Sequence, residues 1–377
     1  MGQTLSEPVT TKQSACCRDE NYLVGSSSMQ GWRVKMEDCH VHILSLPEDP
    51  GTAFFAVYDG HGGATMSQHA GKHLHDYIIK TPEYKQGKIV EAMEQGFLQL
   101  DEAMQADTVL RAERAGTTVI AILIKDNVLY SANAGDSRAI ASVNGYLVEL
   151  SRDHKPTLED ERKRIEAAGG WVEFNRVNGH LALSRALGDF KFKWNNTKTA
   201  EEQIVTGNFK VQIFNLFCTY CLHKSFPEVQ KFEINKDWEF IVLACDGIWD
   251  VMTSHEVLDF IRNYIATQYN VNEDSHPRSR DSSIEDYSED SDKGGKKNLE
   301  KATVDPELIC EELLNHCLAP DALMGTGCDN MTAIVVCLLH GKPVSDLILR
   351  CQRKSHDTEN LLHINSEQEA INNKDAN

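Results

Sequence analysis

The sequence predicts an α+β fold in which antiparallel sheets are covered by helices. Two observations carry the prediction: short apolar runs are joined by hairpin-like turns, and segments with helical start and stop signals lie between them. The expected strands are residues 53–58, 117–124, 128–133, 138–141, 240–244 and 331–339. The expected helices are residues 64–79, a segment from Thr157 to the Gly169-Gly170 pair, and one that starts at Pro306.

The strands are predicted from apolar runs and the turns that bound them. Residues 53–58 and 240–244 are apolar runs of strand length, each followed closely by Asp-Gly, a turn signal. Residues 117–124 and 128–133 flank a short polar turn, which is typical of a hairpin. The glycine-rich turn after residues 53–58 leads into the first expected helix.

The other helices are predicted from their end signals. Thr157 with Asp160 three residues later has the pattern of a capping box, and two glycines stop that helix. Asp305 followed by Pro306 suits a cap and a first helical position. Helices of this kind between hairpin strands favour covered antiparallel sheets over a doubly wound parallel sheet.

Composition bounds the class of protein. The chain has 377 residues, of which 41% are apolar, enough for one large globular domain or two ordinary ones. With 38 basic against 57 acidic residues, the formal charge of −19 argues against a nucleic-acid-binding class, which needs a basic face. The sequence has no run of about 18 apolar residues, so no membrane span is predicted, and we find no secretory signal at its start. The 11 scattered cysteines predict reduced thiols in the cytoplasm or nucleus.

The pattern divides the chain into a tail, one domain and a second tail. We expect an N-terminal tail over residues 1–20, a folded domain over 21–342, and a short helix with a polar tail over 343–377. Two segments interrupt the domain: an atypical apolar insert at about 207–226 and an acidic, Ser-rich insert at about 268–303. The C-x-x-C pair in the first insert lacks partners at zinc-finger spacing and is not interpreted as a zinc site.

The first six residues carry a lipidation pattern. Gly2 after Met1, with Ser6 at the sixth position, predicts N-myristoylation, although the same pattern also occurs in ordinary tails. A single myristoyl chain gives only marginal, reversible membrane binding. We expect a monomer in the cytoplasm, with the nucleus as a second location, and weak membrane association if Gly2 is myristoylated.

Acidic residues recur at the ends of predicted strands. Asp59, Asp136 and Asp246 each adjoin a glycine, and Asp329 lies just before the last strand. Any one of them could be an ordinary turn residue. Together they supply oxygen ligands, which select Mg²⁺ or Mn²⁺ rather than zinc. Crowded carboxylates repel one another unless a cation joins them.

Six sequence blocks in the same order resemble the type-2C metal-dependent protein serine/threonine phosphatases. They are residues 28–38 (SMQGWRVKMED), 58–63 (YDGHGG), 134–138 (AGDSR), 183–189 (LSRALGD), 244–250 (ACDGIWD) and 329–332 (DNMT). The resemblance covers roughly residues 21–342 and is strongest to the animal alpha/beta branch. It implies two packed antiparallel sheets flanked by helices, and hydrolysis of phosphoserine and phosphothreonine by a water that bridges two Mg²⁺ or Mn²⁺ ions.

The resemblance also implies metal ligands. Asp59 would bridge the two ions, Asp246 and Asp329 would complete one, and Glu37 with the Gly60 carbonyl would complete the other. Two further carboxylates would assist. Asp38 would hold metal-bound water, and Asp136 would join Asp246 in a weaker third site.

Two residues would act on the substrate. The Arg33 guanidinium would clamp the phosphate, a geometry that suits its planar fork. His61 would protonate the departing Ser or Thr alkoxide.

Rival functions remain open at this point. A catalytically inactive scaffold of the same fold could bind phosphoproteins, and manganese-dependent turnover would decide between the two. A cysteine-based phosphatase needs His-Cys followed, after five intervening residues, by Arg. After His316-Cys317 the position of that arginine is occupied by Leu323. The insert at 207–226 departs from the family pattern near the flap that frames the substrate.

Overall fold

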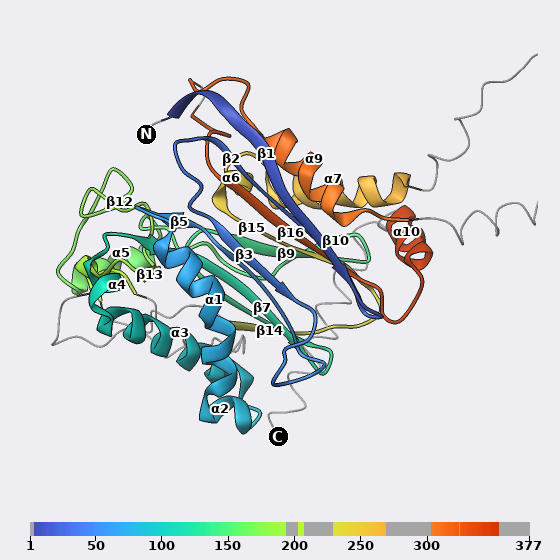
Figure 1. Ribbon diagram of the computed structural model, residues 1–377, viewed down its shortest axis with the longest axis horizontal. Helices are drawn as coiled ribbons and strands as arrows, with labels where there is room; N and C mark the ends of the chain where they lie inside the picture. Colours follow the sequence, from blue (N-terminus) through green and yellow to red (C-terminus); the bar gives the residue numbers. More distant parts are fainter. Residues whose placement is uncertain (1–3, 194–202, 207–228, 269–302, 324, 354–377) are drawn as a thin grey trace, which may run out of the picture.

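The structure is a computed structural model, and it describes residues 4–193, 203–206, 229–268, 303–323 and 325–353. Gly2, the apolar insert at 207–226 and nearly all of the acidic insert at 268–303 lie outside these residues. The predicted boundaries of the two inserts therefore stay predictions. Figure 1 shows two sheets packed together between two groups of helices.

Every pairing within the two large sheets is antiparallel. The six-stranded sheet has the order β1 (Thr4–Arg18), β2 (Tyr22–Arg33), β16 (Met331–Leu338), β15 (Trp238–Ala244), β9 (Arg138–Val143), β10 (Tyr146–Glu149). The five-stranded sheet has the order β14 (Val229–Glu233), β8 (Val128–Ala134), β7 (Val119–Lys125), β4 (Ala53–Tyr58), β3 (Cys39–Ile43). Their inner faces share one apolar core, to which Val24, Phe55, Ile122, Ile241 and Val336 belong.

Helices cover the outer face of each sheet. On the five-stranded sheet lie α1 (Thr65–Lys80) and α3 (Ile89–Ala106), with the short α2 (Pro82–Lys85) and α4 (Thr108–Ala112) beside them. On the six-stranded sheet lie α6 (Asp246–Trp249), α7 (Ser254–Thr267), α9 (Pro306–Cys317) and α10 (Val344–Gln352). The predicted α+β fold with two packed antiparallel sheets is confirmed.

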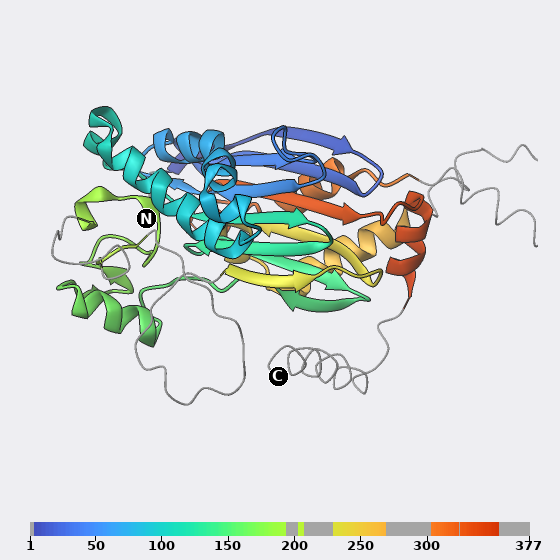
Figure 2. The same cartoon turned by 90° about the horizontal axis from the view of Figure 1, so that it is seen from below.

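A smaller unit projects from one end of the sheets, as Figure 2 shows. It contains α5 (Glu159–Ala167), the hairpin of β11 (Val172–Glu173) and β12 (Arg176–Val177), and the 3₁₀ turn η1 (Phe190–Phe192). A small sheet of β5 (Gly60–His61), β6 (Gly116–Thr117) and β13 (Leu187–Gly188) joins this unit to the ends of the large sheets.

The structure moves both boundaries of the domain outward. Residues 4–18 of the expected N-terminal tail form β1, which pairs with β2 as an edge strand. Its sequence gave no strand signal because an edge strand held by backbone hydrogen bonds need not alternate apolar and polar residues. At the other end, the expected short helix is α10, whose Leu347, Ile348 and Cys351 are buried in the core.

The predicted capping box at Thr157 is wrong. The helix begins later, at Glu159, and has no side-chain cap. Asp160 instead receives two hydrogen bonds of 2.9 Å from the Arg152 guanidinium, a partner that its local sequence does not reveal. The predicted cap at Asp305 is confirmed, because its carboxylate accepts a hydrogen bond from the Leu308 amide.

Candidate metal centre in an acidic cleft

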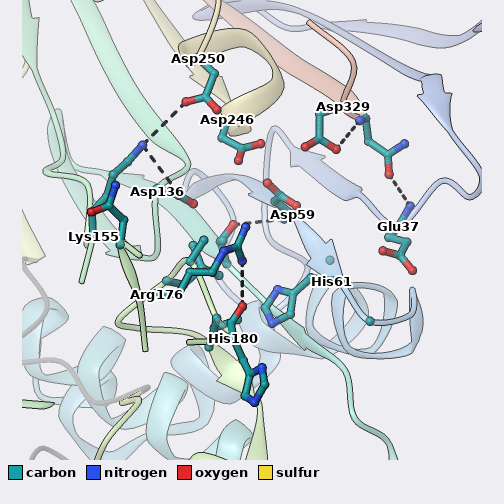
Figure 3. Close-up of a pocket in the computed structure, with 18 of the residues that line it drawn as sticks. Glu37, Asp59, His61, Asp136, Lys155, Arg176, His180, Asp246, Asp250 and Asp329 are labelled. Atoms are coloured by element: carbon teal, nitrogen blue, oxygen red, sulfur yellow. Dashed lines mark hydrogen bonds and ion pairs between the residues drawn. The ribbon is translucent and has the colours of Figure 1, made fainter. Parts of the chain in front are cut away.

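The acidic residues predicted from strand ends meet at one end of the two sheets. Asp59 follows β4 in one sheet, Asp246 follows β15 in the other, and Asp329 precedes β16. Their side chains point toward one another in an open cleft of about 1240 Å³ (Figure 3). The cleft is also lined by the other predicted ligand and substrate-binding residues, Arg33, Glu37, Gly60, His61 and Asp136.

Asp59 is fixed by its own backbone. Its amide donates to the Thr118 hydroxyl at 3.3 Å, and its carbonyl accepts from the Thr118 amide at 2.9 Å. Burial raises the pKa of the Asp59 carboxyl well above its usual range, and the charge of Asp246 raises it further. A rigid carboxyl among like charges is ready to share a cation.

Asp246 is placed by a close approach of two chain segments. Gly247 follows it in α6, and a Cβ at that glycine would lie 2.1 Å from the Asn330 carbonyl oxygen. Only glycine therefore lets α6 start against β16. Burial, followed by the charges of Asp329 and Asp250, raises the pKa of Asp246 to about 6.

Asn330 ties the loop after β2 to β16. Its side-chain amide donates to the carbonyls of Gln30 (2.8 Å) and Lys35 (3.0 Å), and its side-chain oxygen accepts from the Glu37 amide (2.9 Å). These bonds bring Glu37 to the cleft from a segment 293 residues away along the chain. Sequence reasoning missed this role, although Asn330 lies in one of the six blocks.

The donor set fits a hard divalent cation. Asp38 accepts from the Thr332 hydroxyl at 2.7 Å through Oδ2, while its buried Oδ1 has no hydrogen-bond partner. Burial raises the pKa of Asp38 to about 7. Ligand atoms of Asp38, Asp59 and Cys245 lie within 4.8 Å of one another. An orphaned carboxylate oxygen beside a second carboxyl is one that a water bound to Mg²⁺ or Mn²⁺ would satisfy.

Cys245 is a packing residue in this cluster. Burial raises the pKa of its thiol well above the ordinary value, so the thiolate is disfavoured. Its sulfur accepts a hydrogen bond from the Thr332 amide at 3.2 Å. A neutral thiol is a poor ligand for Mg²⁺ or Mn²⁺, which prefer oxygen.

Arg33 lies at the rim of the cleft, where its guanidinium forms an ion pair with Asp329. The two side chains are 39% and 33% exposed, so a substrate can reach them from solvent. Arg33, the residue predicted to bind the substrate phosphate, therefore lies in the cleft. In this structure its guanidinium is paired with Asp329, a predicted metal ligand.

His61 has a buried partner that the sequence analysis did not assign. Its Nε2 lies 2.6 Å from Oδ2 of Asp189, whose side chain is only 2% exposed. Gly116 makes the contact possible, because a Cβ there would lie 2.3 Å from that carboxylate oxygen and 2.6 Å from Nε2. Asp189 holds φ at 52°, an uncommon conformation for a residue other than glycine.

Asp136 lines the same cleft, next to a lysine. It is 6% exposed, and its Oδ1 has no hydrogen-bond partner. Burial and the charge of Asp246 raise its pKa well above the usual range, against the opposing charge of Lys155. Lys155 and Asp250, which line the same cleft, were not among the predicted site residues.

A cluster of carboxyls at one end of two packed antiparallel sheets is a site that can hold divalent metal ions, as in the class of metal-dependent enzymes. Comparison with known families agrees, since the family described as Protein phosphatase 2C matches residues 22–323. The chain belongs to this family, and it is a metal-dependent protein serine/threonine phosphatase. The rival inactive scaffold has no support. Assignment to the animal alpha/beta branch stays a prediction.

Individual relatives support the same conclusion. The chain is 52% identical to a probable protein phosphatase 2C of Caenorhabditis elegans, over 94% of this chain and 85% of that protein. It is 42% identical to a protein phosphatase 2C homolog of Schizosaccharomyces pombe, over 90% of this chain and 70% of that protein. A solved phosphatase structure from Toxoplasma gondii, 23% identical, has a TM-score of 0.62 and covers 87% of this chain and 96% of its own; it supports the fold.

Proposed function

We propose that the cleft binds two Mg²⁺ or Mn²⁺ ions and hydrolyses phosphoserine and phosphothreonine in proteins. The observation that carries the proposal is the crowd of carboxyls whose pKa values are raised by burial and by one another. Asp59, Asp246 and Asp329, with Glu37 and the Gly60 carbonyl, would hold the two ions. Bound there, the ions would activate water as a nucleophile and neutralise charge on the phosphoryl group.

Arg33, His61 and Asp38 are proposed to bind the substrate phosphate, the leaving group and ordered water. Arg33 would exchange its ion pair with Asp329 for the phosphate oxygens, which its planar fork can bind through two hydrogen bonds. His61 would donate a proton to the departing alkoxide, oriented by its hydrogen bond to Asp189. Asp38 would accept hydrogen bonds from ordered water through its free Oδ1.

Turnover of a phosphoserine peptide, measured with and without a chelator, tests the proposal. We expect activity to vanish with chelator and to return when Mn²⁺ is restored. Calorimetric titration of the metal-free protein should give two tight sites. Turnover that survives complete metal removal would reject the proposal.

Asp136 is proposed as a ligand of a third, weaker cation. Replacing it with Ala should lower turnover by about tenfold or more, because a cation that stabilises charge in the reaction is removed. The two tight sites should remain in calorimetry, since Asp136 is not among their proposed ligands. Loss of the tight pair would show instead that Asp136 supports the central site.

Location and assembly are proposed on compositional grounds. We propose a cytoplasmic, monomeric enzyme that acts on phosphorylated proteins and contacts membranes weakly when Gly2 is acylated. Within the described residues, no helix is both long and apolar enough to cross a bilayer. Gly2 itself lies outside the described residues, so its acylation stays a prediction.

Replacing Gly2 with Ala tests the acylation. The substitution should abolish myristate incorporation in cells, because the modification needs the glycine amine. Turnover in solution should be unchanged, since Gly2 is not among the proposed metal ligands or substrate-binding residues. A wild-type protein whose mature N-terminus is unmodified in the mass spectrum would contradict the prediction.

A further inference from the structure

Lys155 lies among three carboxylates at the edge of the acidic cleft. Its Nζ is 3.9 Å from Asp136, 3.8 Å from Asp250 and 4.0 Å from Asp153. All three distances exceed the 2.7–2.9 Å typical of a charged hydrogen bond. The ammonium is therefore held by charge alone, and Figure 3 shows it between Asp136 and Asp250.

The three carboxylates are not equivalent. Asp153 already receives two hydrogen bonds of 2.9 Å from the Arg138 guanidinium, so its charge is compensated. Asp136 is buried and keeps one oxygen without a hydrogen-bond partner. The charge of Lys155 therefore acts mainly on Asp136 and Asp250. These two carboxylates together could bind a divalent cation.

The backbone around Lys155 is held by hydrogen bonds, while its side chain reaches solvent. The His154 amide donates to the Gly135 carbonyl at 2.8 Å, and the His154 carbonyl accepts from the Ser184 amide at 3.2 Å. These bonds fasten residue 154 to the turn that holds Asp136. The Lys155 side chain is 41% exposed, so its ammonium can leave the carboxylates for solvent without moving the chain.

We propose that Lys155 is a built-in counter-ion for the Asp136 site, and that a divalent cation binds there only by displacing its ammonium. The inference rests on the proposed function of the cleft, since it concerns the third cation of that site. Displacing the ammonium gives up its Coulomb attraction to the carboxylates, which lowers the affinity of the site for a divalent cation. The third site would be weak for this reason, whereas among the described residues no lysine forms an ion pair with the proposed central ligands Asp59, Asp246, Asp329 and Glu37.

Lys155→Met tests the proposal, because methionine keeps much of the side-chain length and removes the charge. Mn²⁺ is titrated into the enzyme with its two tight sites filled, and free Mn²⁺ is counted by electron paramagnetic resonance. A unit charge about 4 Å away at the effective dielectric of a protein surface opposes a cation strongly enough for a change of about tenfold or more. The weak dissociation constant should fall by that factor.

Two controls separate charge from shape. Lys155→Arg keeps the charge and should stay near the wild-type constant. Lys163→Met removes a lysine that is 71% exposed on α5 and pairs with Glu159, and it should also change nothing. Lys155→Gln provides a second neutral variant if the methionine protein does not fold, and a retained tight pair reports that the site is intact.

The outcomes are distinct. An unchanged weak constant in both neutral variants, or loss of the weak site, would overturn the counter-ion role. Persistence of the tightened site in Lys155→Met/Asp136→Ala would place the cation elsewhere and would also overturn it. Failure of the proposed function has a different signature, because the wild-type enzyme would then lack the tight pair.

Discussion

Asp246→Asn should lower turnover of a phosphoserine peptide by at least about 10³-fold at limiting Mn²⁺. Asparagine keeps the size of the side chain and removes the charge that a shared metal ligand supplies. Metal ions typically stabilise charge in such reactions by several kcal/mol, and about 4 kcal/mol corresponds to 10³-fold. Asp59→Asn should lose at least as much, because Asp59 is the proposed bridging ligand. Steady-state kinetics over a Mn²⁺ titration measure both effects.

In the metal-free protein, Asp246→Asn should increase the stability of the fold, although it lowers turnover. Burial and neighbouring charges raise the pKa of Asp246 to about 6 from 3.8. The folded protein thus binds this proton more tightly than the unfolded chain. The group stabilises the fold below about pH 4, and that contribution is lost as the pH rises through 6. At pH 7, Asp246→Asn should therefore raise the melting temperature of the metal-free protein and reduce the gain from added Mn²⁺.

A matched control is available on the same face of the six-stranded sheet. Asp259 is exposed on α7, away from the cleft, and Asp259→Asn should change neither turnover nor the response to Mn²⁺. Wild-type turnover of Asp246→Asn at limiting Mn²⁺ would remove Asp246 from the metal ligands. A fall in the melting temperature of the metal-free variant would show that the carboxylate is not strained by its neighbours.

The strand-end carboxyls could be predicted because their signals are local. An apolar run followed by Asp-Gly marks both a strand and its end, and Asp59 and Asp246 were found in this way. The structure agrees, since β4 ends at Tyr58 and β15 ends at Ala244. The position of both carboxyls in one cleft depends on how the two sheets pack, which no local signal encodes. The family resemblance implied this packing, and the periodicity of the sequence alone did not.

The parts that sequence reasoning missed depend on contacts between distant segments. Asn330 binds a loop 293 residues away, and Asp189 meets His61 across 128 residues. No pattern within a window of the chain encodes such pairs. Lys155 was missed for another reason: a single lysine beside a histidine and a proline has no motif of its own. Its role depends on which carboxylates surround it.

The missed boundary and cap have a common physical cause. β1 is stabilised by its backbone pairing with β2, and Asp160 is occupied by the Arg152 guanidinium. In both places a tertiary contact replaces the local signal on which the prediction depended. Local signals succeeded where a neighbouring residue in the sequence caps the helix, as Asp305 does by accepting a hydrogen bond from a first-turn amide of α9.

His61→Gln should slow hydrolysis of a phosphoserine peptide by about 10²–10⁴-fold, the usual contribution of general acid catalysis. Serine alkoxide is strongly basic and needs a proton to leave, whereas nitrophenolate leaves without help. The loss on nitrophenyl phosphate should therefore be much smaller. Calorimetry should find the two tight metal sites unchanged, because His61 is not a proposed ligand. The ratio of kcat/KM for the two substrates is the measurement.

The hydrogen bond to Asp189 sharpens this prediction, because it permits two interpretations of His61. The bond orients the imidazole and leaves Nδ1 as the other ring nitrogen, but a histidine that merely anchors a buried carboxylate would make the same bond. If His61 is the acid, Asp189→Asn should lower peptide turnover by roughly tenfold or more, the size of losses when a partner that orients a functional histidine is removed. Turnover of nitrophenyl phosphate should change little.

His73→Gln is a control, because His73 lies on α1 and is not among the residues that line the cleft. It should change the turnover of neither substrate. In the double variant, Asp189→Asn should add nothing to His61→Gln, because the orienting bond has then lost its target. Equal losses on both substrates would mean that His61 shapes the site, and the proton donor would be another group in the cleft.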